Sequence, residues 1–467
     1  MSRWYTDIIQ VAKLADYGPA RGTMVIRPYG YRIWEFVQKE FNKSIQALGA
    51  ENAYFPLFIP MKLLQREKDH VKGFSPELAI VTHGGGKKLA EPLVVRPTSE
   101  TIMYEMYAKW ISSWRDLPLK INQWNNVVRW EKRTYFFLRT LEFLWQEGHT
   151  AHATYDEAEK MARDALDAYE TIYKETFAMP GLIGIKSESE KFAGADHTYA
   201  IEFLMPDGKV LQGATSHHLG DNFSKAFKIQ YQDKKGKMKY VYQTSWGLTT
   251  RSIGGMILTH GDDAGLVIPP RLAPIKAVII PVLGKEDEKI IDFCKKIKKD
   301  IEAGKTKFPG KVEIWDESEK SFGWKNNEAD IKGIPARIVV GPEELNKKSV
   351  LVQLRIPESK ELKEDEVAEG VESLLEGAQK YIYEKAKKFL DENIREAKNY
   401  DEFKKIMKEK RGFIKAFWCE DPKCEESIKE ETKATTRLKS LDGKSGDGKC
   451  IYCGKKAKYI WFFGQAY

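Results

Sequence analysis

Residues 121–149 read INQWNNVVRWEKRTYFFLRTLEFLWQEGH, and this stretch decides the fold. Two strand-like runs, Ile121–Arg129 and Glu142–Trp145, flank a turn-prone insert. Successive side chains of a strand point to opposite faces, so we expect Arg129 and Glu131 on one face of a sheet. Other long strands follow along the chain, with helices between only some of them. This order favours an α+β domain built on an antiparallel sheet over regular βαβ alternation.

Two helices and a strand are predicted on either side of this stretch. Arg32–Leu48 repeats apolar residues at helical spacing and is predicted to be a helix. Ala53–Pro60 is predicted to be a strand that ends at its proline. Asp156–Phe177 is strongly amphipathic, which predicts a helix with Asp156 as its N-cap.

Differences in composition and in predicted secondary structure divide the chain into three segments. Residues 1–272 are rich in aromatic residues and strand-like runs. Residues 273–376 alternate short apolar strands, such as Val278–Val282, with charged helical stretches, which is typical of a small α/β domain. Residues 377–467 begin with a charged helical stretch at Gln379–Lys410 and end with a cluster of cysteines. We therefore expect three domains with these boundaries.

The composition excludes several classes of protein. The chain has 467 residues, of which 42% are apolar and 31% charged, unlike a disordered or collagen-like chain. No apolar run approaches the roughly 18 residues that a membrane span needs, and the N-terminal residues hold no uninterrupted apolar stretch of a secretory signal. The net charge of +8 is compatible with a nucleic-acid partner but does not require one. A protein of the cytoplasm without membrane contact is expected.

The cysteines predict a structural metal site. Cys419 and Cys424 form one close pair, and Cys450 and Cys453 form another. Four thiolates in two pairs match the tetrahedral ligand set of Zn²⁺, with no position left open for chemistry. The alternative is four unrelated thiols. Cys294 is left over and is expected to be a buried apolar residue.

Three clusters in the first segment join arginine to carboxylates or glycine. They are Arg96–Glu100 (RPTSE), the Arg129-Trp130-Glu131 group, and Gly247–Arg251 (GLTTR) with glycines soon after. Glycine beside arginine lets the backbone approach a phosphate closely. Several arginines and carboxylates on one sheet suit a polyphosphate bound next to a small zwitterion. The alternative for Arg129 and Glu131 is a simple cross-strand ion pair.

These residues resemble the sequence motifs of the class II aminoacyl-tRNA synthetases. Arg129-x-Glu131, with Arg139 and Phe143, resembles motif 2, Gly247–Arg251 resembles motif 3, and the helix and strand ending at Pro60 resemble motif 1. Three further runs resemble the prolyl-tRNA synthetase family, of the archaeal/eukaryotic type: RPTSE at 96–100, EFLWQEGH at 142–149 and QGATSH at 212–217. The resemblance covers nearly the whole chain.

The resemblance implies a fold and an activity. It implies a class II catalytic domain over residues 1–272, an α/β anticodon-binding domain over 273–376 and a small zinc-containing domain over 377–467. The implied reaction joins proline to ATP to form prolyl-adenylate and then transfers proline to the 3′ end of tRNA(Pro). The implied partners are proline, ATP with Mg²⁺, tRNA(Pro), a structural Zn²⁺ and a second copy of the chain in a homodimer.

The resemblance also implies roles for single residues at the nucleotide. Arg129 is expected to hold the α-phosphate and the proline carboxylate, and Arg139 and Arg251 to hold the γ-phosphate end. These three arginines are the expected catalytic residues, because arginine binds phosphate through a planar fork and stabilises developing charge. Glu131 is expected to read the adenine amino group and Phe143 to stack on the adenine. The further expected ATP contacts are Thr140, Gln212 and Thr249.

Other roles concern the amino acid, the metal and the anticodon. Thr98 and Glu100 are expected to accept hydrogen bonds from the proline amine. The residues expected to shape the proline pocket are Trp145, Glu147, His149 and His217. Asp330 and Arg337 are the expected anticodon contacts, and Cys419, Cys424, Cys450 and Cys453 the expected zinc ligands.

The sequence departs from the family pattern in places. The turn at Lys132–Phe137 is one residue shorter than usual and lacks the customary His-Pro, which bears on acceptor-stem contacts. A helix and several strands already fill the gap between His149 and Arg251, so we expect no editing insertion and release of tRNA mischarged with alanine or cysteine. The aromatic tail that ends at Tyr467 is expected either to complete the core of the zinc domain or to reach the catalytic domain, with its terminal carboxylate near the active site.

Three other functions compete with this interpretation. The first is a class II synthetase for another amino acid such as threonine, whose enzymes use a metal in the active site. The second is a relative that binds but has lost catalysis, and the third is a zinc-containing nucleic-acid protein without chemistry. Proline-dependent exchange of pyrophosphate into ATP would discriminate among them.

Overall fold

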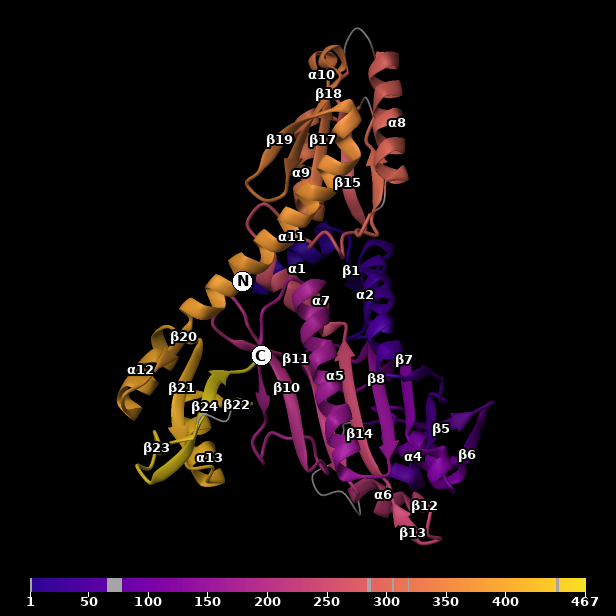
Figure 1. Ribbon diagram of the computed structural model, residues 1–467, viewed down its shortest axis with the longest axis vertical. Helices are drawn as coiled ribbons and strands as arrows, with labels where there is room; N and C mark the ends of the chain where they lie inside the picture. Colours follow the sequence, from indigo (N-terminus) through magenta and orange to yellow (C-terminus); the bar gives the residue numbers. More distant parts are fainter. Residues whose placement is uncertain (1, 65–77, 284–286, 305, 318, 442–444) are drawn as a thin grey trace.

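The computed structural model describes residues 2–64, 78–283, 287–304, 306–317, 319–441 and 445–467. Figure 1 shows three bodies: a large sheet-based body at lower right, an α/β body at the top and a smaller body at lower left. The long helix α11 (Val367–Glu392) runs from the α/β body towards the smaller one. Within the described residues no helix is long and apolar enough to cross a membrane.

The main body is built around a large sheet. Its strands lie in the order β9-β10-β11-β14-β8-β7-β3, and all of these neighbours pair antiparallel except β3 and β7. The bounds are β3 (Glu51–Asn52), β7 (Leu119–Val128), β8 (Glu142–His152), β9 (Leu182–Ile185), β10 (His197–Leu204), β11 (Val210–Gly220) and β14 (Tyr242–Thr249). The predicted α+β class with an antiparallel sheet is confirmed.

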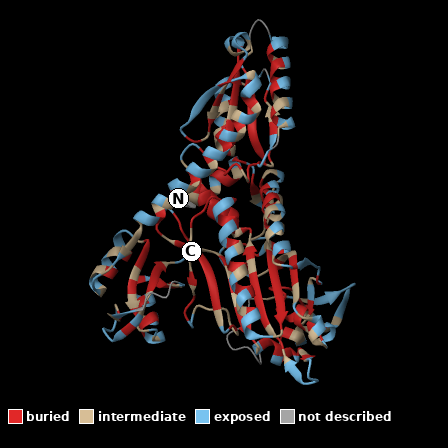
Figure 2. Cartoon of the chain, viewed as in Figure 1, coloured by how far each residue is buried: buried red, intermediate tan, exposed pale blue. Residues whose placement is uncertain are grey.

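Helices cover the sheet on one side and leave the other for the site. Helix α5 (Tyr155–Glu175) packs across β8, β10, β11 and β14, and α2 (Pro28–Ala47) packs on α5. Figure 2 shows buried strands beneath helices whose outer faces are exposed. The remaining elements of this body are α1 (Ser2–Val11), β1 (Ala15–Tyr17), β2 (Met24–Ile26), β4 (Phe58–Pro60), β5 (Ala79–Gly84), β6 (Lys87–Val95), α4 (Glu100–Trp110), a 3₁₀ turn (Trp114–Asp116), α6 (Asn222–Phe227), β12 (Gln230–Gln232), β13 (Met238–Tyr240) and α7 (Arg251–His260).

The α/β body has a mixed five-stranded sheet in the order β16-β15-β17-β18-β19. The pairs that β15 makes are parallel, and the other two pairs are antiparallel. The bounds are β15 (Ile275–Pro281), α8 (Asp287–Ala303), β16 (Lys311–Ile314), α9 (Phe322–Lys332), β17 (Ala336–Val340), α10 (Pro342–Lys347), β18 (Ser349–Leu354), β19 (Ser359–Lys363) and a 3₁₀ turn (Glu364–Glu366). The predicted small α/β domain is confirmed.

The smaller body continues the main sheet. Strand β22 pairs with β9 at Lys439↔Ile185 and Ser440↔Gly184, so one sheet of twelve described strands runs through both bodies. The bounds are β20 (Ile394–Glu396), α12 (Tyr400–Glu409), β21 (Phe413–Trp418), α13 (Pro422–Thr432), β22 (Ala434–Ser440), β23 (Ser445–Lys449) and β24 (Lys456–Gln465). Helix α11 is continuous across residue 377, and the helical stretch predicted at 379–410 is two helices with β20 between them.

Two local predictions are wrong. Helix α5 begins at Tyr155 and its cap is Thr154, whose hydroxyl accepts from the Glu157 N–H while the Glu157 carboxylate accepts from the Thr154 N–H. Asp156 lies in the first turn, where a carboxylate favours the helix N-terminus without capping it. The strand predicted over 53–60 is interrupted: only residues 51–52 and 58–60 pair, because each belongs to a different sheet.

Candidate active site

The strand β8 presents four of the expected site residues on one face. Phe143, Trp145, Glu147 and His149 alternate along it and line a cavity of about 260 Å³. Gly148 points to the other face, where a Cβ would lie 2.2 Å from the Trp246 ring, so only glycine fits there. The alternation of a β-strand therefore builds this wall of the cavity directly from the sequence.

Strands β11 and β14, with the starts of α4 and α7, complete the cavity. In the register of the sheet His149 lies opposite Ser245 of β14, and Ser245 lies opposite His217 of β11. The other expected site residues that line the cavity are Thr98, Glu100, Arg129, Gln212, Thr249 and Arg251. Segments far apart in the sequence thus meet at one place.

Glu147 is the centre of a buried hydrogen-bond network. It accepts from Asn125 Nδ2 at 2.7 Å, Gln123 Nε2 at 3.1 Å and the Ser99 hydroxyl. His149 Nε2 lies 3.0 Å from the other Glu147 oxygen. Burial by itself would raise the pKa of Glu147, but the hydrogen bonds from His149, Ser99 and Asn125 outweigh it and hold the pKa below its ordinary value. Glu147 is therefore an anion at neutral pH.

Two histidines of the cavity have pKa values that are shifted in opposite directions. Burial would lower the pKa of His149, but its hydrogen bond to Glu147 and the charges of Glu100 and Glu147 raise it above the ordinary value. Burial, helped by the charge of His149, lowers the pKa of His217 to about 3. The Thr198 hydroxyl lies 2.9 Å from His217 Nδ1, and the Thr215 hydroxyl lies 3.0 Å from His217 Nε2. His217 is consequently a neutral hydrogen-bonding group.

Arg129 lies against the aromatic wall of the first cavity. Its guanidinium carbon is 5.4 Å from the centre of the Phe143 ring and 5.6 Å from that of Trp145. Its Nε donates to the Pro97 carbonyl at 3.1 Å. Burial lowers the pKa of Arg129, and the charges of Glu100 and Glu147 oppose this. The guanidinium stays charged, because arginine does not lose its proton in proteins.

A second, arginine-rich cavity of about 450 Å³ adjoins the first. Gln212 and Arg251 line both cavities, so they form the wall between them. Arg139 and Arg133 line only the second. Burial lowers the pKa of Arg251, and so do the charges of Arg129 and Arg139 nearby. Like charges at this distance repel each other, and an anion between them would relieve that repulsion.

Three expected contacts do not line the first cavity. Strand β7 ends at Val128, so Arg129 and Glu131 follow the strand instead of sharing its face, and that prediction is wrong. Glu131 Oε2 lies 3.4 Å from Arg139 Nε across the turn. Thr140 lines neither cavity, and its hydroxyl donates to the Glu142 carbonyl at 2.7 Å.

The expected anticodon residues lie far from these cavities, in the α/β body. Arg337 Nη1, on β17, is 2.9 Å from Asp330 Oδ1, near the end of α9. Arg355 Nε lies 3.6 Å from the same Asp330 oxygen, and Arg355 also pairs with Asp262 of the main body. Asp330 and Arg337 are thus brought together as an ion pair.

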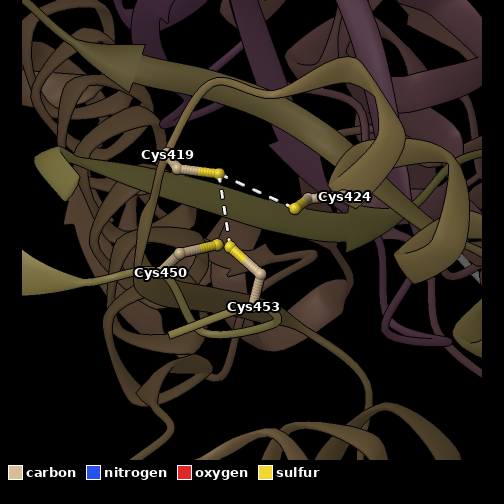
Figure 3. Close-up of side chains that lie close together, drawn as sticks. All are labelled: Cys419, Cys424, Cys450 and Cys453. Carbon is tan, nitrogen blue, oxygen red and sulfur yellow. Dashed lines mark hydrogen bonds between the residues drawn. The ribbon is translucent and has the colours of Figure 1, made fainter. Parts of the chain in front are cut away.

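The four cysteines gather at one point of the smaller body, as Figure 3 shows. Cys419 Sγ is 3.7 Å from the sulfurs of both Cys424 and Cys453, and all four sulfurs lie within 4.8 Å of one another. Four thiolates around one zinc at about 2.3 Å would be spaced by about 3.8 Å. The donor set and its spacing therefore fit a structural zinc. Cys294 is buried in the core of the α/β body, as expected.

Comparison with protein families covers all three bodies. Residues 86–260 match the tRNA synthetase class II core domain (G, H, P, S and T), residues 276–376 the anticodon binding domain, and residues 400–467 the C-terminal domain of prolyl-tRNA synthetase. The chain is 49% identical to the proline–tRNA ligases of Natranaerobius thermophilus and Clostridium novyi, over 100% of its own length and 96% of theirs. The chain belongs to the class II prolyl-tRNA synthetase family.

Solved structures of prolyl-tRNA synthetases agree with this assignment. The Cryptosporidium parvum enzyme complexed with halofuginone and AMPPNP has a TM-score of 0.95 and 43% identity, with 100% of this chain and 97% of that chain covered. The same enzyme complexed with L-proline and AMP has a TM-score of 0.94 and 41% identity, with 100% and 95% covered. The predicted catalytic, anticodon-binding and C-terminal domains of a prolyl-tRNA synthetase are confirmed, and the chain is a proline–tRNA ligase.

Sequence reasoning missed several residues of this prolyl-tRNA synthetase site. Asn125 and Gln123 hold Glu147, and the Tyr104 hydroxyl lies 3.2 Å from His149 Nδ1. Asn125 and Gln123 sit on β7 at alternate positions, a signal that could have placed them beside β8. Arg437 and Lys209 line the second cavity, and no local pattern predicts this because the smaller body brings Arg437 there by folding.

Proposed function

We propose that proline and ATP react at the wall shared by the two cavities. The single observation that carries this proposal is that Gln212 and Arg251 line both cavities. They separate a pocket with buried carboxylates from a pocket rich in arginines. The first pocket suits a small ammonium ion with an apolar ring, and the second suits a polyphosphate. Attack of a carboxylate on the α-phosphate requires the two substrates to meet end to end, and this wall is where they would do so.

In this proposal the first cavity holds proline. Glu100 and Glu147 supply negative charge for its secondary ammonium, and Thr98, whose hydroxyl is bonded to Glu100, adds a further polar contact. Trp145 provides an apolar wall for the ring. His149 holds Glu147 in place, and neutral His217 fills the far side.

The three arginines act on the phosphates. Arg129, which faces both the carboxylates and the aromatic wall, binds the proline carboxylate and the α-phosphate as the new bond forms. Arg139 and Arg251 draw the leaving pyrophosphate into the second cavity. Mg²⁺ arrives with ATP as part of the substrate and neutralises phosphoryl oxygens. Charge that develops on those oxygens is stabilised without a covalent intermediate on the protein.

The adenine is placed against Phe143, with Thr249 and Glu131 beside it. The Glu131 carboxylate, near Arg139 across the turn, accepts from the adenine amino group in this arrangement. Thr140 contributes by holding the chain between Arg139 and Glu142, since its hydroxyl is occupied by the Glu142 carbonyl.

The remaining roles follow the domains. The α/β body reads the anticodon of tRNA(Pro) with Asp330 and Arg337, whose pairing orients both groups. The smaller body is stabilised by zinc bound to the four cysteines, and its thiolates suit a reducing cytoplasm. The helix and strands that end at Pro60 form the interface of a homodimer.

We further propose that the enzyme is of the archaeal/eukaryotic type and has no editing insertion between His149 and Arg251. Residues 150–250 are all described, and their long strands and helices belong to the main body or pack on it. Alanine is smaller than proline, and an apolar pocket discriminates by only about 1–3 kcal/mol per methylene-sized difference. Alanine, and also cysteine, should therefore be activated and released as mischarged tRNA(Pro).

The first experiment is exchange of pyrophosphate into ATP by the purified chain. Exchange that depends on proline and is absent with threonine supports the assignment of the first cavity, and exchange with threonine alone contradicts it. Alanyl-tRNA(Pro) is then incubated with the chain. Survival of the ester over many turnovers supports the lack of editing, and rapid hydrolysis would show a hydrolytic site.

A further inference from the structure

A buried ion cluster joins the smaller body to the main sheet. Glu202, on β10, is fully buried, and its two oxygens accept from Arg437 Nη2 at 2.8 and 2.9 Å. Lys186 Nζ donates to the same carboxylate. The side chains of Arg437 and Lys186 are 6% and 2% exposed. Three charges buried this deeply carry a large desolvation penalty, so the cluster is not explained by stability alone.

Glu202 lies beside the wall between the two cavities. In the pairing of β10 with β11, Glu202 is opposite Gln212, which lines both cavities together with Arg251. Arg437 itself lines the arginine-rich cavity. Its Nη2 is engaged by Glu202 and its Nη1 by the Thr435 hydroxyl at 3.0 Å. Arg437 is therefore held in one orientation at the edge of that cavity.

The smaller body is also hydrogen-bonded to the turn between β10 and β11. The Gly412 N–H donates to the Gly208 carbonyl at 3.0 Å, and Arg411 Nη1 donates to the Asp207 carbonyl at 3.2 Å. At the start of β11 the Tyr467 N–H donates to the Val210 carbonyl at 3.1 Å. Contacts at the turn and at Glu202 together fix the place of β11, and with it Gln212.

We propose that Glu202 and Arg437 are positioning residues for ATP, through which the smaller body takes part in the activation of proline. As a pair they hold β11 so that Gln212 and Arg251 meet the phosphates. Neither touches the reacting atoms in this proposal: Glu202 is bonded to Arg437 and Lys186, and the two terminal nitrogens of Arg437 donate to Thr435 and Glu202. The inference rests on the proposed function, which places the phosphates beside Gln212 and Arg251.

A second buried carboxylate at the same interface provides a matched control. Glu425, on α13, accepts from the Ser187 hydroxyl of the main body at 2.9 Å and also from the hydroxyls of Ser189 and Thr436. It is 6% exposed. The hollow that it lines includes neither Gln212 nor Arg251. Loss of Glu425 should weaken the interface without moving the wall of the ATP site.

The experiment compares Glu202→Gln, Arg437→Gln and Glu425→Gln in the full zinc-loaded chain. For each, zinc content, thermal midpoint, kcat and the KM values for ATP and proline are measured in pyrophosphate exchange. We expect the KM for ATP to rise about tenfold in the first two variants, a size that coupled neighbouring groups reach, while the KM for proline changes little. The Glu202→Gln/Arg437→Gln double variant should be no worse than either single variant.

Several outcomes separate this inference from its rivals. An unchanged KM for ATP in zinc-loaded Glu202→Gln and Arg437→Gln overturns it, and so does an equal rise in Glu425→Gln, which would indicate general loosening. If Arg437→Gln does not fold, Arg437→Lys keeps the charge but not the forked pair, and a smaller rise in the KM for ATP is expected. Arg251→Ala is measured alongside: if it keeps full exchange the proposed function fails, whereas if only the Glu202 and Arg437 variants are unaffected the present inference fails alone.

Discussion

Arg129 is half-buried among groups that both attract and repel its charge. Two aromatic rings face its guanidinium and two carboxylates lie near it. Its charge also lowers the pKa of the neighbouring Arg251. Under the proposed function, a bound phosphate would add negative charge beside the arginines and stabilise them further. The same holds for Arg251, whose pKa is lowered by burial and by its neighbours. Under the proposed function, both stand ready for charge that appears only during the reaction.

Replacement of Arg129 or Arg251 by Ala should reduce kcat of proline-dependent pyrophosphate exchange by about 100- to 1000-fold, the range for loss of one preorganised donor. The reason is that, in the proposed function, each faces phosphoryl oxygens on which charge develops. Thermal midpoints serve as the control for folding. Exchange within tenfold of the wild-type rate in both variants would refute these roles.

His260 gives a prediction about acid stability. Its Nε2 lies 2.9 Å from the Phe177 carbonyl, and burial lowers its pKa to about 4. Between pH 6.5 and pH 4 the unfolded chain binds a proton at this histidine that the folded chain does not, so stability falls as the pH falls. The loss should approach about 1.4 kcal/mol per pH unit.

The measurement is urea unfolding of the wild type, His260→Gln and the exposed-site control His83→Gln at pH 7.5 and pH 5. We expect the stability difference between the two pH values to shrink in His260→Gln and to stay the same in His83→Gln. An unchanged difference in His260→Gln would mean that this histidine is not buried neutral.

At the scale of elements, the sequence predicted those that have a local periodic pattern. It missed strands that form only by pairing with a strand elsewhere in the chain. The amphipathic pattern of α5 is local and predicted that helix, and the strand predicted at Glu142–Trp145 is the first part of β8. β19 was missed because its residues SKELK are charged and mostly exposed, and only pairing with β18 makes them a strand. The strand expected over 53–60 failed because its two halves pair with different partners, which no local pattern reveals.

The same contrast holds for the candidate site. Glu147 and His149 were expected from the family resemblance, and they lie together in the first cavity at alternate positions of β8. Thr140 was expected there and lies outside it, because its hydroxyl is taken by a carbonyl two residues on. Arg437 was missed because it reaches the second cavity from a body more than two hundred positions away along the chain.

The cysteine cluster gives a prediction about the elements of the smaller body. We expect about one Zn per chain by metal analysis of the purified protein. Cys419→Ser combined with Cys453→Ser should lose the metal and lower the thermal midpoint of this body, because the site ties β21 and α13 to the loop after β23. Cys294→Ser, the control, should keep it. Full zinc content in the double variant would show that the ligand set is wrong.

At the scale of the whole molecule, the end of the chain returns to the main body. Tyr467 donates its N–H to Val210, its phenol contacts Asp207, and Lys209 lies 5.0 Å from its ring centre. Tyr467 also lines the second cavity together with Arg139 and Arg251. The sequence left open whether the tail packs within its own body or reaches the catalytic body. Trp461 and Phe463 do the first and Tyr467 the second.

Deletion of residues 464–467 should therefore lower proline activation several-fold, mainly through the KM for ATP, while zinc content stays at its wild-type value. The reason is loss of the Tyr467–Val210 contact at the start of β11 and of one wall of the second cavity. Steady-state pyrophosphate exchange measures it. Normal kinetics in the truncated protein would reduce the tail to packing.

The sheet shared by two bodies has a consequence for biosynthesis. The main body of the enzyme is translated long before β22, so during synthesis β9 exposes unpaired backbone donors and acceptors along its outer side. An open strand of this kind is a template for pairing with other chains. A ribosome that stalls or terminates before residue 440 would release a nearly complete catalytic body in an aggregation-prone state, and slow translation of the last stretch would prolong the period in which a chaperone must shield it.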